Sequence, residues 1–170
     1  FRGDVEPIDA VAGHVPGVLE PLSRLAHNYW WSWSGDGAAA LFGRIDAERW
    51  ERCGHNPVRL LQEVAPARFD ALAGDNAFLS TLGDVVSRFE AELARAARAG
   101  SDPSHPVAFV CAEFGVHRSL PFYAGGLGVL AGDILKEASD QALPLVGVGL
   151  FYSEGSFHQR IDADGWQHEY

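Results

Sequence analysis

The sequence is poor in basic residues, and this shortage limits what the protein can bind. Lys136 is its only lysine, and the formal net charge is −10. A protein that binds the phosphate backbone of nucleic acids needs a basic face, and so does one that binds an anionic membrane surface. We therefore expect neither nucleic acid nor membrane among its partners.

Cysteines and long apolar runs are scarce as well. Cys53 and Cys111 are the two cysteines, and neither lies in a CxxC motif or at a Cys/His spacing typical of metal sites. The sequence thus predicts no metal site and no disulfide framework. No apolar run approaches the roughly 20 residues that a membrane-spanning helix needs, and no signal peptide opens the sequence. We expect a soluble, cytoplasmic protein.

Several familiar catalytic motifs are missing. The sequence contains no Walker loop and no HExxH motif, and no Ser/His/Asp arrangement is visible. Its main glycine run does not follow the GxGxxG pattern either, which disfavours a dinucleotide site.

The first hundred residues, by contrast, are rich in helical signals. Apolar residues recur three or four positions apart, Asp46 and Asn56 can cap helices, and glycines follow several of the runs. The pattern predicts an α-helical N-terminal region, with helices over residues 16–35, 46–50, 56–63 and 66–74 and a long one reaching from about Phe78 to Ala99.

Residues 29–33 read Tyr-Trp-Trp-Ser-Trp, which places four aromatics in five positions. They cannot all face one core from a single helix, so at least one ring should reach a neighbouring element, a partner subunit or a ligand. Aromatic rings stack on sugars as well as on other rings. Because large aromatics most often serve packing, we predict core or interdomain packing for this cluster rather than direct sugar contact.

Residues 101–106 form the clearest linker, because they are polar and carry two prolines. We place a domain boundary there. The sequence predicts a helical N-terminal region over residues 1–104 and the first part of an α/β domain over residues 105–170.

The predicted α/β part begins with a strand–helix–strand unit. A hairpin follows, with Asp162-Ala163-Asp164-Gly165 as its turn. A sheet of this size is too small for the large α/β proteins built from such units. We therefore expect a segment of a longer protein. The predicted strands are residues 107–111, 145–151, 157–161 and 165–170.

A glycine run, Gly125-Gly126-Leu127-Gly128, precedes the predicted helix of this unit. Glycines at such a place let the backbone approach a ligand and present unpaired N–H groups at the positive end of the helix dipole. That arrangement suits an anion, above all phosphate. The glycines could equally serve only a tight turn and close packing of helix on sheet, and spacing alone does not separate the two interpretations.

Glu113, His117 and Arg118 follow the first predicted strand. Open α/β sheets bind ligands at the carboxyl ends of their strands, so these side chains are candidate site residues. Arg118 could pair with Glu113 or with a phosphate, and His117 could act as an acid, a base or a hydrogen-bond donor. For Glu113 we favour a role in bracing the loop beside the glycine run, because a buried carboxylate persists mainly when paired.

Several blocks together resemble a known family. In chain order they resemble the amino-terminal domain of α-glucan phosphorylases, in particular the short bacterial form of glycogen phosphorylase. The resemblance covers nearly the whole sequence, and so many ordered blocks are far more specific than the glycine run alone. The blocks are NYWWSW at 28–33, WERCGHNPVRLL at 50–61, AEFGVHRSLP at 112–121, YAGGLGVLAGD at 123–133 and PLVGVGLFY at 144–152.

The resemblance implies a GT-B fold, with two α/β lobes facing each other across a cleft. It implies reversible cleavage of α-1,4-glucan by orthophosphate, with release of glucose 1-phosphate, and it implies pyridoxal phosphate as cofactor. Gly125, Gly126 and Leu127 match the turn that lies beside the cofactor phosphate, the substrate phosphate and the glucosyl unit. The cofactor lysine lies in the other lobe of such enzymes, so we expect no catalytic residue in this segment and interpret Lys136 as a solvated helix residue.

Two positions depart from the longer animal-type enzymes. Those enzymes carry Asn before the paired glycines and an aromatic after the Glu-Phe pair, where this sequence has Ala124 and Gly115. Two other functions also stay open, a nucleotide-sugar-dependent GT-B glycosyltransferase and a non-enzymatic α-glucan-binding module. Glycosyltransferases of the first kind, such as glycogen or starch synthases, usually have a lysine two residues before the glycines, and this sequence has Tyr123 there instead. A homo-oligomer is compatible with any of these functions.

Overall fold

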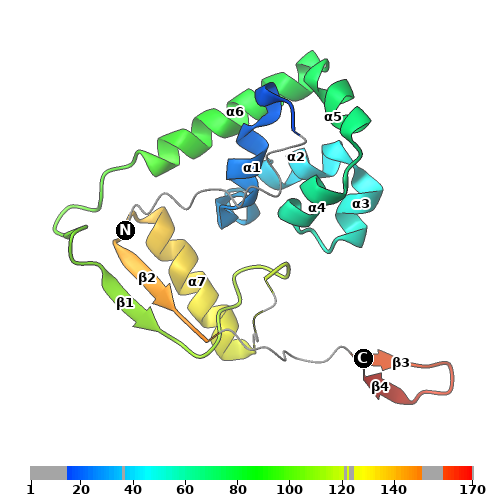
Figure 1. Cartoon of the computed structure of the whole chain (residues 1–170). Helices are drawn as coiled ribbons and strands as arrows, with labels where there is room; N and C mark the ends of the chain where they lie inside the picture. Colours follow the sequence, from blue (N-terminus) through cyan, green and yellow to red (C-terminus); the bar gives the residue numbers. More distant parts are fainter. Residues whose placement is uncertain (1–14, 36, 121, 123–124, 151–158, 170) are drawn as a thin grey trace.

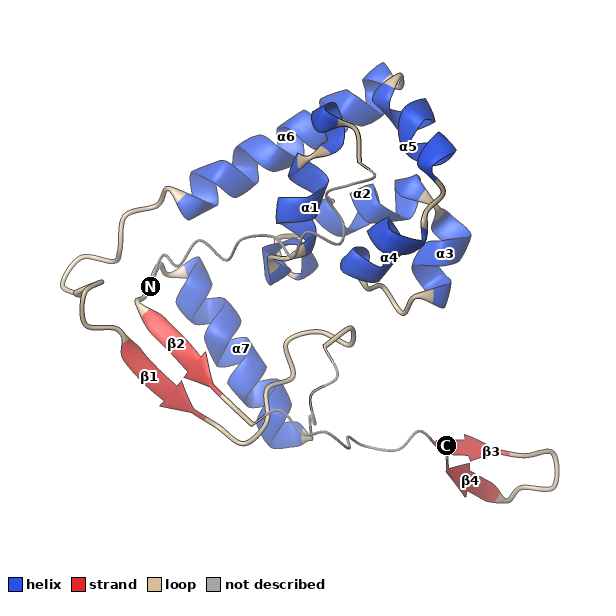
Figure 2. Cartoon of the chain, viewed as in Figure 1, coloured by secondary structure: helices blue, strands red, loops and turns tan. Residues whose placement is uncertain are grey.

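The computed structural model describes residues 15–35, 37–120, 122, 125–150 and 159–169. A helical region comes first, a strand–helix–strand unit lies beside it, and a two-stranded hairpin follows in the chain (Figures 1 and 2). The predicted mixture of a helical N-terminal region with a small amount of strand is therefore confirmed. The GT-B lobe stays a prediction.

Short helices with local caps build the helical region. The side chains of Asp46 and Asn56 accept the backbone N–H groups of Arg49 and Arg59, and Pro57 occupies a first-turn position. The helices predicted at residues 46–50, 56–63 and 66–74 are confirmed, the last of them beginning at Pro66 without a side-chain cap. The elements are η1 (Gly17–Leu19), α1 (Pro21–Ala26), η2 (Tyr29–Ser32), α2 (Ala38–Ile45), α3 (Ala47–Arg52), α4 (Pro57–Glu63), α5 (Pro66–Ala73) and α6 (Asn76–Leu93).

The prediction of one helix over residues 16–35 is wrong. Pro21 lies at the start of α1, because proline has no N–H to give to a preceding turn. The side chain of Asn28 accepts the N–H of Trp30 and begins η2 as a separate 3₁₀ turn. Tyr29 and Trp33 therefore do not share one helical face with the apolar residues of α1.

Two further helix predictions need correction. The sequence reading does not include helix α2, because Gly35 indicates only the end of the preceding run; Gly37 precedes the first residue of α2 in a left-handed conformation (φ 81°). Helix α6 ends at Leu93 rather than near Ala99. Beyond Leu93 the sequence has no apolar stripe to bury, and its arginines reach across to another element instead.

The core of the helical region is aromatic and aliphatic. Trp30 packs against Phe89 of α6 in a tilted arrangement with ring centroids 5.6 Å apart, and Trp31 makes T-shaped contacts with Phe42 and Trp50 at 5.5 and 5.9 Å. Only 7% of Trp30 and 2% of Trp31 is exposed. These two rings serve packing, as predicted, and neither can stack on a sugar in this conformation.

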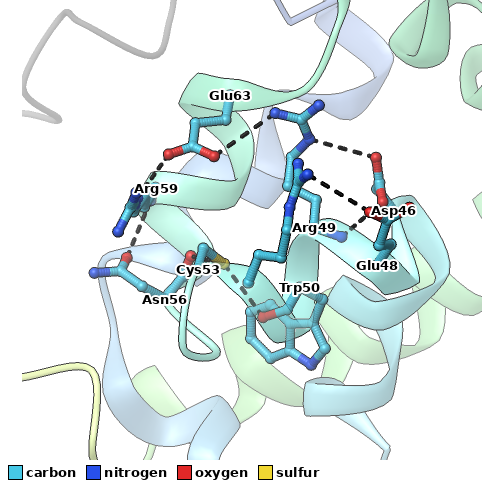
Figure 3. Close-up of polar contacts among 9 residues, drawn as sticks. Asp46, Glu48, Arg49, Trp50, Cys53, Asn56, Arg59 and Glu63 are labelled. Atoms are coloured by element: carbon cyan, nitrogen blue, oxygen red, sulfur yellow. Dashed lines mark hydrogen bonds and ion pairs between the residues drawn. The ribbon is translucent and has the colours of Figure 1, made fainter.

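Charged side chains join α3 to α4 at the surface of this core (Figure 3). Arg49 lies between two carboxylates, with its Nε 3.4 Å from Asp46 Oδ2 and its Nη1 3.6 Å from Glu63 Oε2. Glu63 also accepts from Arg59 Nε at 2.6 Å. Because these groups are partly exposed, the contacts add little stability.

The strand–helix–strand unit has the predicted order, with shorter strands. Strand β1 (Val107–Val110) pairs in parallel with β2 (Leu145–Val148), and Val107 lies opposite Leu145. Helix α7 (Gly126–Asp140) connects them and packs on β2 through Leu135, which would lie 3.1 Å from a Cβ added to Gly147. The hairpin pairs β3 (Gln159–Ile161) with β4 (Gln167–Glu169) in antiparallel fashion. Residues 151, 157, 158 and 170, also predicted as parts of strands, lie outside the described residues.

The helical region contacts both ends of the segment that carries α7 (Figure 1). Near its C-terminal end, Trp33 Nε1 donates to Asp140 Oδ1 at 3.1 Å and Arg95 Nη1 donates to the carbonyl of Asp140 at 2.7 Å. In the loop before α7, Tyr29 Oη lies 3.1 Å from Ser119 Oγ. These contacts cross the boundary predicted at residues 104 and 105, which stays a prediction.

Candidate functional site

The glycine run forms the N-terminus of α7. Gly125 is the cap residue, in an extended conformation (φ −88°, ψ −159°), and no side chain among the described residues caps the helix. The first intrahelical hydrogen bond runs from Val129 N–H to Gly125 O at 3.1 Å. The N–H groups of Gly126, Leu127 and Gly128 precede that bond, so they have no acceptor within the helix. Together with the helix dipole they favour a negative charge at this end.

Glu113 contacts the glycine run directly. Its Oε2 accepts a short hydrogen bond from the backbone N–H of Gly125. A Cβ added to Gly125 would lie 3.5 Å from the same oxygen. The carboxylate thus holds the entrance of α7 through a backbone N–H, and no ion pair between Glu113 and Arg118 occurs among the described residues.

The loop after β1 packs very closely on α7. Gly115 N–H donates to Gly128 O at 2.7 Å, and a Cβ added to Gly132 would lie 2.3 Å from Gly115 O. Only glycine fits at position 132, because the loop backbone occupies the space of any side chain. Sequence reasoning missed Gly132. Its signal is the four-residue spacing from Gly128, which places two glycines on one face of a helix.

Replacing Gly132 by alanine should therefore destabilise the α7 unit, although alanine is the better helix former. We expect a loss of about 1–3 kcal/mol, the usual cost of overpacking. Gly83→Ala in α6 is the matched control, since a Cβ there meets nothing within 4 Å. The measurement is protection of α7 amides in hydrogen exchange of the full-length protein. Equal protection in both variants would contradict the close packing described above.

His117 lies at the other side of the same loop. Its Nδ1 accepts the backbone N–H of Ser119 at 3.2 Å and lies 2.9 Å from Ser119 Oγ. The edge of its ring meets Trp31, with centroids 4.9 Å apart. Arg118 is exposed, and both residues line a cavity of about 350 Å³ formed by residues 114–118, 120 and 122.

The surroundings of His117 favour its neutral form. Burial lowers the pKa of His117, and the positive charges of His55, Arg118 and Lys136 lower that pKa further. The stability that neutral His117 contributes is therefore complete above its ordinary pKa of 6.5 and is lost as the pH falls through its lower folded-state value.

We accordingly expect the melting temperature of the full-length protein to fall between about pH 7.5 and about pH 5, in part because His117 must take up a proton in the folded state. The variant His117→Gln has no titrating ring, so its melting temperature should fall less over the same range. Parallel curves for the two proteins would show that His117 does not contribute.

The structure thus brings the candidate residues together in two groups. Glu113, Gly125 and Gly126 lie at the N-terminus of α7, while His117 and Arg118 lie around the cavity of the preceding loop. The side chain of Leu127 is 56% exposed. Among the described residues, no cluster of three or more His, Cys, Asp or Glu side chains is arranged to hold a metal.

A family model described as "Protein of unknown function (DUF3417)" matches residues 15–120. The chain belongs to this family. The region that DUF3417 describes joins the helical region, β1 and the loop with Glu113, His117 and Arg118 in one unit, and it ends just before the glycine run.

Curated relatives extend this similarity through the glycine run. A protein named "Glycogen phosphorylase" from Mycobacterium tuberculosis is 45% identical over 168 residues, covering 94% of this chain and 19% of its own length. "Maltodextrin phosphorylase" from Thermococcus litoralis is 39% identical over 166 residues (95% and 20%), and "Glycogen phosphorylase" from Aquifex aeolicus is 40% identical over 152 residues (89% and 22%). The resemblance predicted from the sequence blocks is confirmed.

The DUF3417 chain spans about a fifth of the length of these curated relatives. No solved structure matches it significantly. Of the helices in the described ranges, none combines the length and the apolar character that crossing a membrane requires.

Proposed function

We propose that this chain is the amino-terminal segment of an α-1,4-glucan phosphorylase, which cleaves glycogen or maltodextrin with orthophosphate and releases glucose 1-phosphate. One observation carries the proposal. Relatives named glycogen phosphorylase and maltodextrin phosphorylase match 89–95% of the chain at 39–45% identity. The segment alone would be inactive, because the catalytic groups would lie in the remainder of the enzyme.

The geometry of the glycine run supports a role in binding phosphate. Gly126 and Leu127 offer backbone N–H groups at the N-terminus of α7, and a Cβ added to Gly126 would meet nothing within 4 Å. Backbone donors stabilise phosphate charge without bringing a proton of their own. Glu113 holds Gly125 in place, so the donors that follow are already oriented when phosphate binds.

The same donors fit the phosphate group of pyridoxal phosphate, with Gly126 and Leu127 as the residues that would hold it. When bound, that phosphate group supplies a proton donor and acceptor for the substrate phosphate. The lysine that carries the cofactor is expected outside this segment. Lys136 lies on α7 with its Nζ 3.6 Å from Asp133 Oδ1, away from the glycine run.

The exposed strands support a larger sheet in the complete protein. Val107, Val110 and Val148 are 62%, 74% and 47% exposed, whereas parallel strands are ordinarily covered on both faces. We propose that β1 and β2 belong to a GT-B lobe that begins near residue 105, after a helical region over residues 1–104. The proposed enzyme is cytoplasmic, and a homo-oligomer is compatible with it.

The test uses the full-length protein. We expect absorbance of bound pyridoxal phosphate, together with release of glucose 1-phosphate from glycogen that depends on orthophosphate. If the cofactor were absent and the protein transferred glucosyl units from a nucleotide sugar, the proposed fold would stand. The proposed activity would then be that of a glycogen or starch synthase.

A further inference from the structure

The aromatic residues of the 3₁₀ turn η2 and of Trp33 directly after it contact two different parts of the chain. Trp30 and Trp31 are buried in the core of the helical region, while Tyr29 and Trp33 are half-buried and reach the α7 segment. A single short turn thereby joins the helical core to the part of the chain that carries the glycine run. Packing alone does not require the polar atoms of Tyr29 and Trp33 to form specific hydrogen bonds. Both nevertheless do so, Tyr29 with Ser119 and Trp33 with Asp140.

Tyr29 begins a chain of hydrogen bonds that ends on His117. Its Oη lies 3.1 Å from Ser119 Oγ, which in turn lies 2.9 Å from His117 Nδ1. A backbone N–H can only donate, so the bond from Ser119 N–H assigns Nδ1 as an acceptor. The His117 ring is therefore neutral and carries its proton on Nε2. Donation from Tyr29 to Ser119 and from Ser119 to His117 gives each hydroxyl an acceptor, with Nδ1 shared by the hydroxyl and the backbone N–H of Ser119.

The loop that carries this chain is fixed to the glycine run at its other end. Glu113 accepts the N–H of Gly125, and Gly115 donates to Gly128. Residues 113–119 thus connect the first turn of α7 to Tyr29. A shift of Ser119 relative to Tyr29 would be passed to Gly125 through a short, closely packed segment, since Gly132 leaves the loop no room to relax.

We propose that Tyr29 and Ser119 are positioning residues for the glycine run, and that the helical region uses them to hold its N–H groups in the geometry that orthophosphate requires. This proposal rests on the proposed phosphorylase function. It gives Tyr29 a role in the reaction that reaches beyond packing. Neither residue touches substrate, and both act through the loop at 113–119.

The test compares Tyr29→Phe and Ser119→Ala with Trp33→Phe in the full-length enzyme. Tyr29→Phe keeps the ring and removes only the hydroxyl, so the fold should survive. We expect kcat/KM for orthophosphate to fall about three- to tenfold, the range for one lost hydrogen bond. Trp33→Phe removes a comparable bond to Asp140 at the far end of α7 and should leave kcat/KM unchanged.

A double variant and the melting temperatures separate positioning from stability. Tyr29→Phe should add little in the Ser119→Ala background, because both substitutions break the same chain. Equal losses of activity in Tyr29→Phe and Trp33→Phe that follow their melting temperatures would overturn the proposal, as would an unchanged kcat/KM in Tyr29→Phe. A wild-type protein without phosphorolysis would instead overturn the proposed function, and this proposal with it.

Discussion

Replacing Gly126 by valine should lower phosphorolysis by about 10²-fold while the protein still folds. Gly126 is the first residue of α7, it is exposed, and a Cβ there would meet nothing within 4 Å. A branched side chain would nevertheless stand where phosphate and the glucosyl unit approach the backbone N–H groups. Misplacement of a reacting group by about 1 Å is enough for a loss of this size. The measurements are kcat/KM for orthophosphate and the cofactor content of the full-length enzyme.

Gly83→Val is the control for this substitution. Gly83 lies inside α6 with open space around it, so valine there changes helix propensity without approaching the glycine run. The control should keep its activity, and both variants should melt close to the wild-type temperature. Near-normal phosphorolysis in Gly126→Val would remove the role that we assign to the glycine run.

The second large effect is expected on stability. Trp30→Ala should cost about 3–5 kcal/mol, the usual range for truncating a buried tryptophan. Only 7% of Trp30 is exposed, and its ring lies on Phe89 with centroids 5.6 Å apart, so alanine would leave a cavity between η2 and α6. The measurement is urea-dependent proteolysis of the helical region in the full-length protein.

An exposed position provides the comparison for Trp30. Val18 is 53% exposed in the same region, and Val18→Ala should change stability by less than about 0.5 kcal/mol. An unchanged melting temperature in Trp30→Ala, combined with weaker binding of glucan, would assign Trp30 to a sugar-binding surface instead of the core.

The sequence predicts best those features whose causes lie within a few residues. Asp46 and Asn56 bond to N–H groups three positions away, so the starts of α3 and α4 can be read from the sequence directly. The strand–helix–strand order around α7 follows from apolar runs and the glycines between them. The same reasoning gives a wrong result at residues 16–35, where a single apolar periodicity runs through three separate elements, η1, α1 and η2.

The candidate site depends on contacts that no spacing encodes. The bond between Tyr29 and Ser119 joins residues 90 positions apart. The sequence favours a bracing role for Glu113, but it does not show that this role is a hydrogen bond from Gly125 N–H. Gly132 was overlooked because its reason for being glycine is the backbone of Gly115, which belongs to another element. Sequence reasoning named Glu113, His117 and the glycine run as candidates, but not the contacts that join them.

The pairing of Val107 with Leu145 also bears on the order in which parts of the chain can fold during synthesis. Helices α1 to α6 are complete at Leu93, and the buried residues of their core all precede it, so they can fold while β2 is still unmade. Strand β1 must wait for its parallel partner until α7 has been synthesised. Tyr29 would then already be in its folded position when Ser119 leaves the ribosome. The helical region would act as a template on which the loop and the glycine run fold.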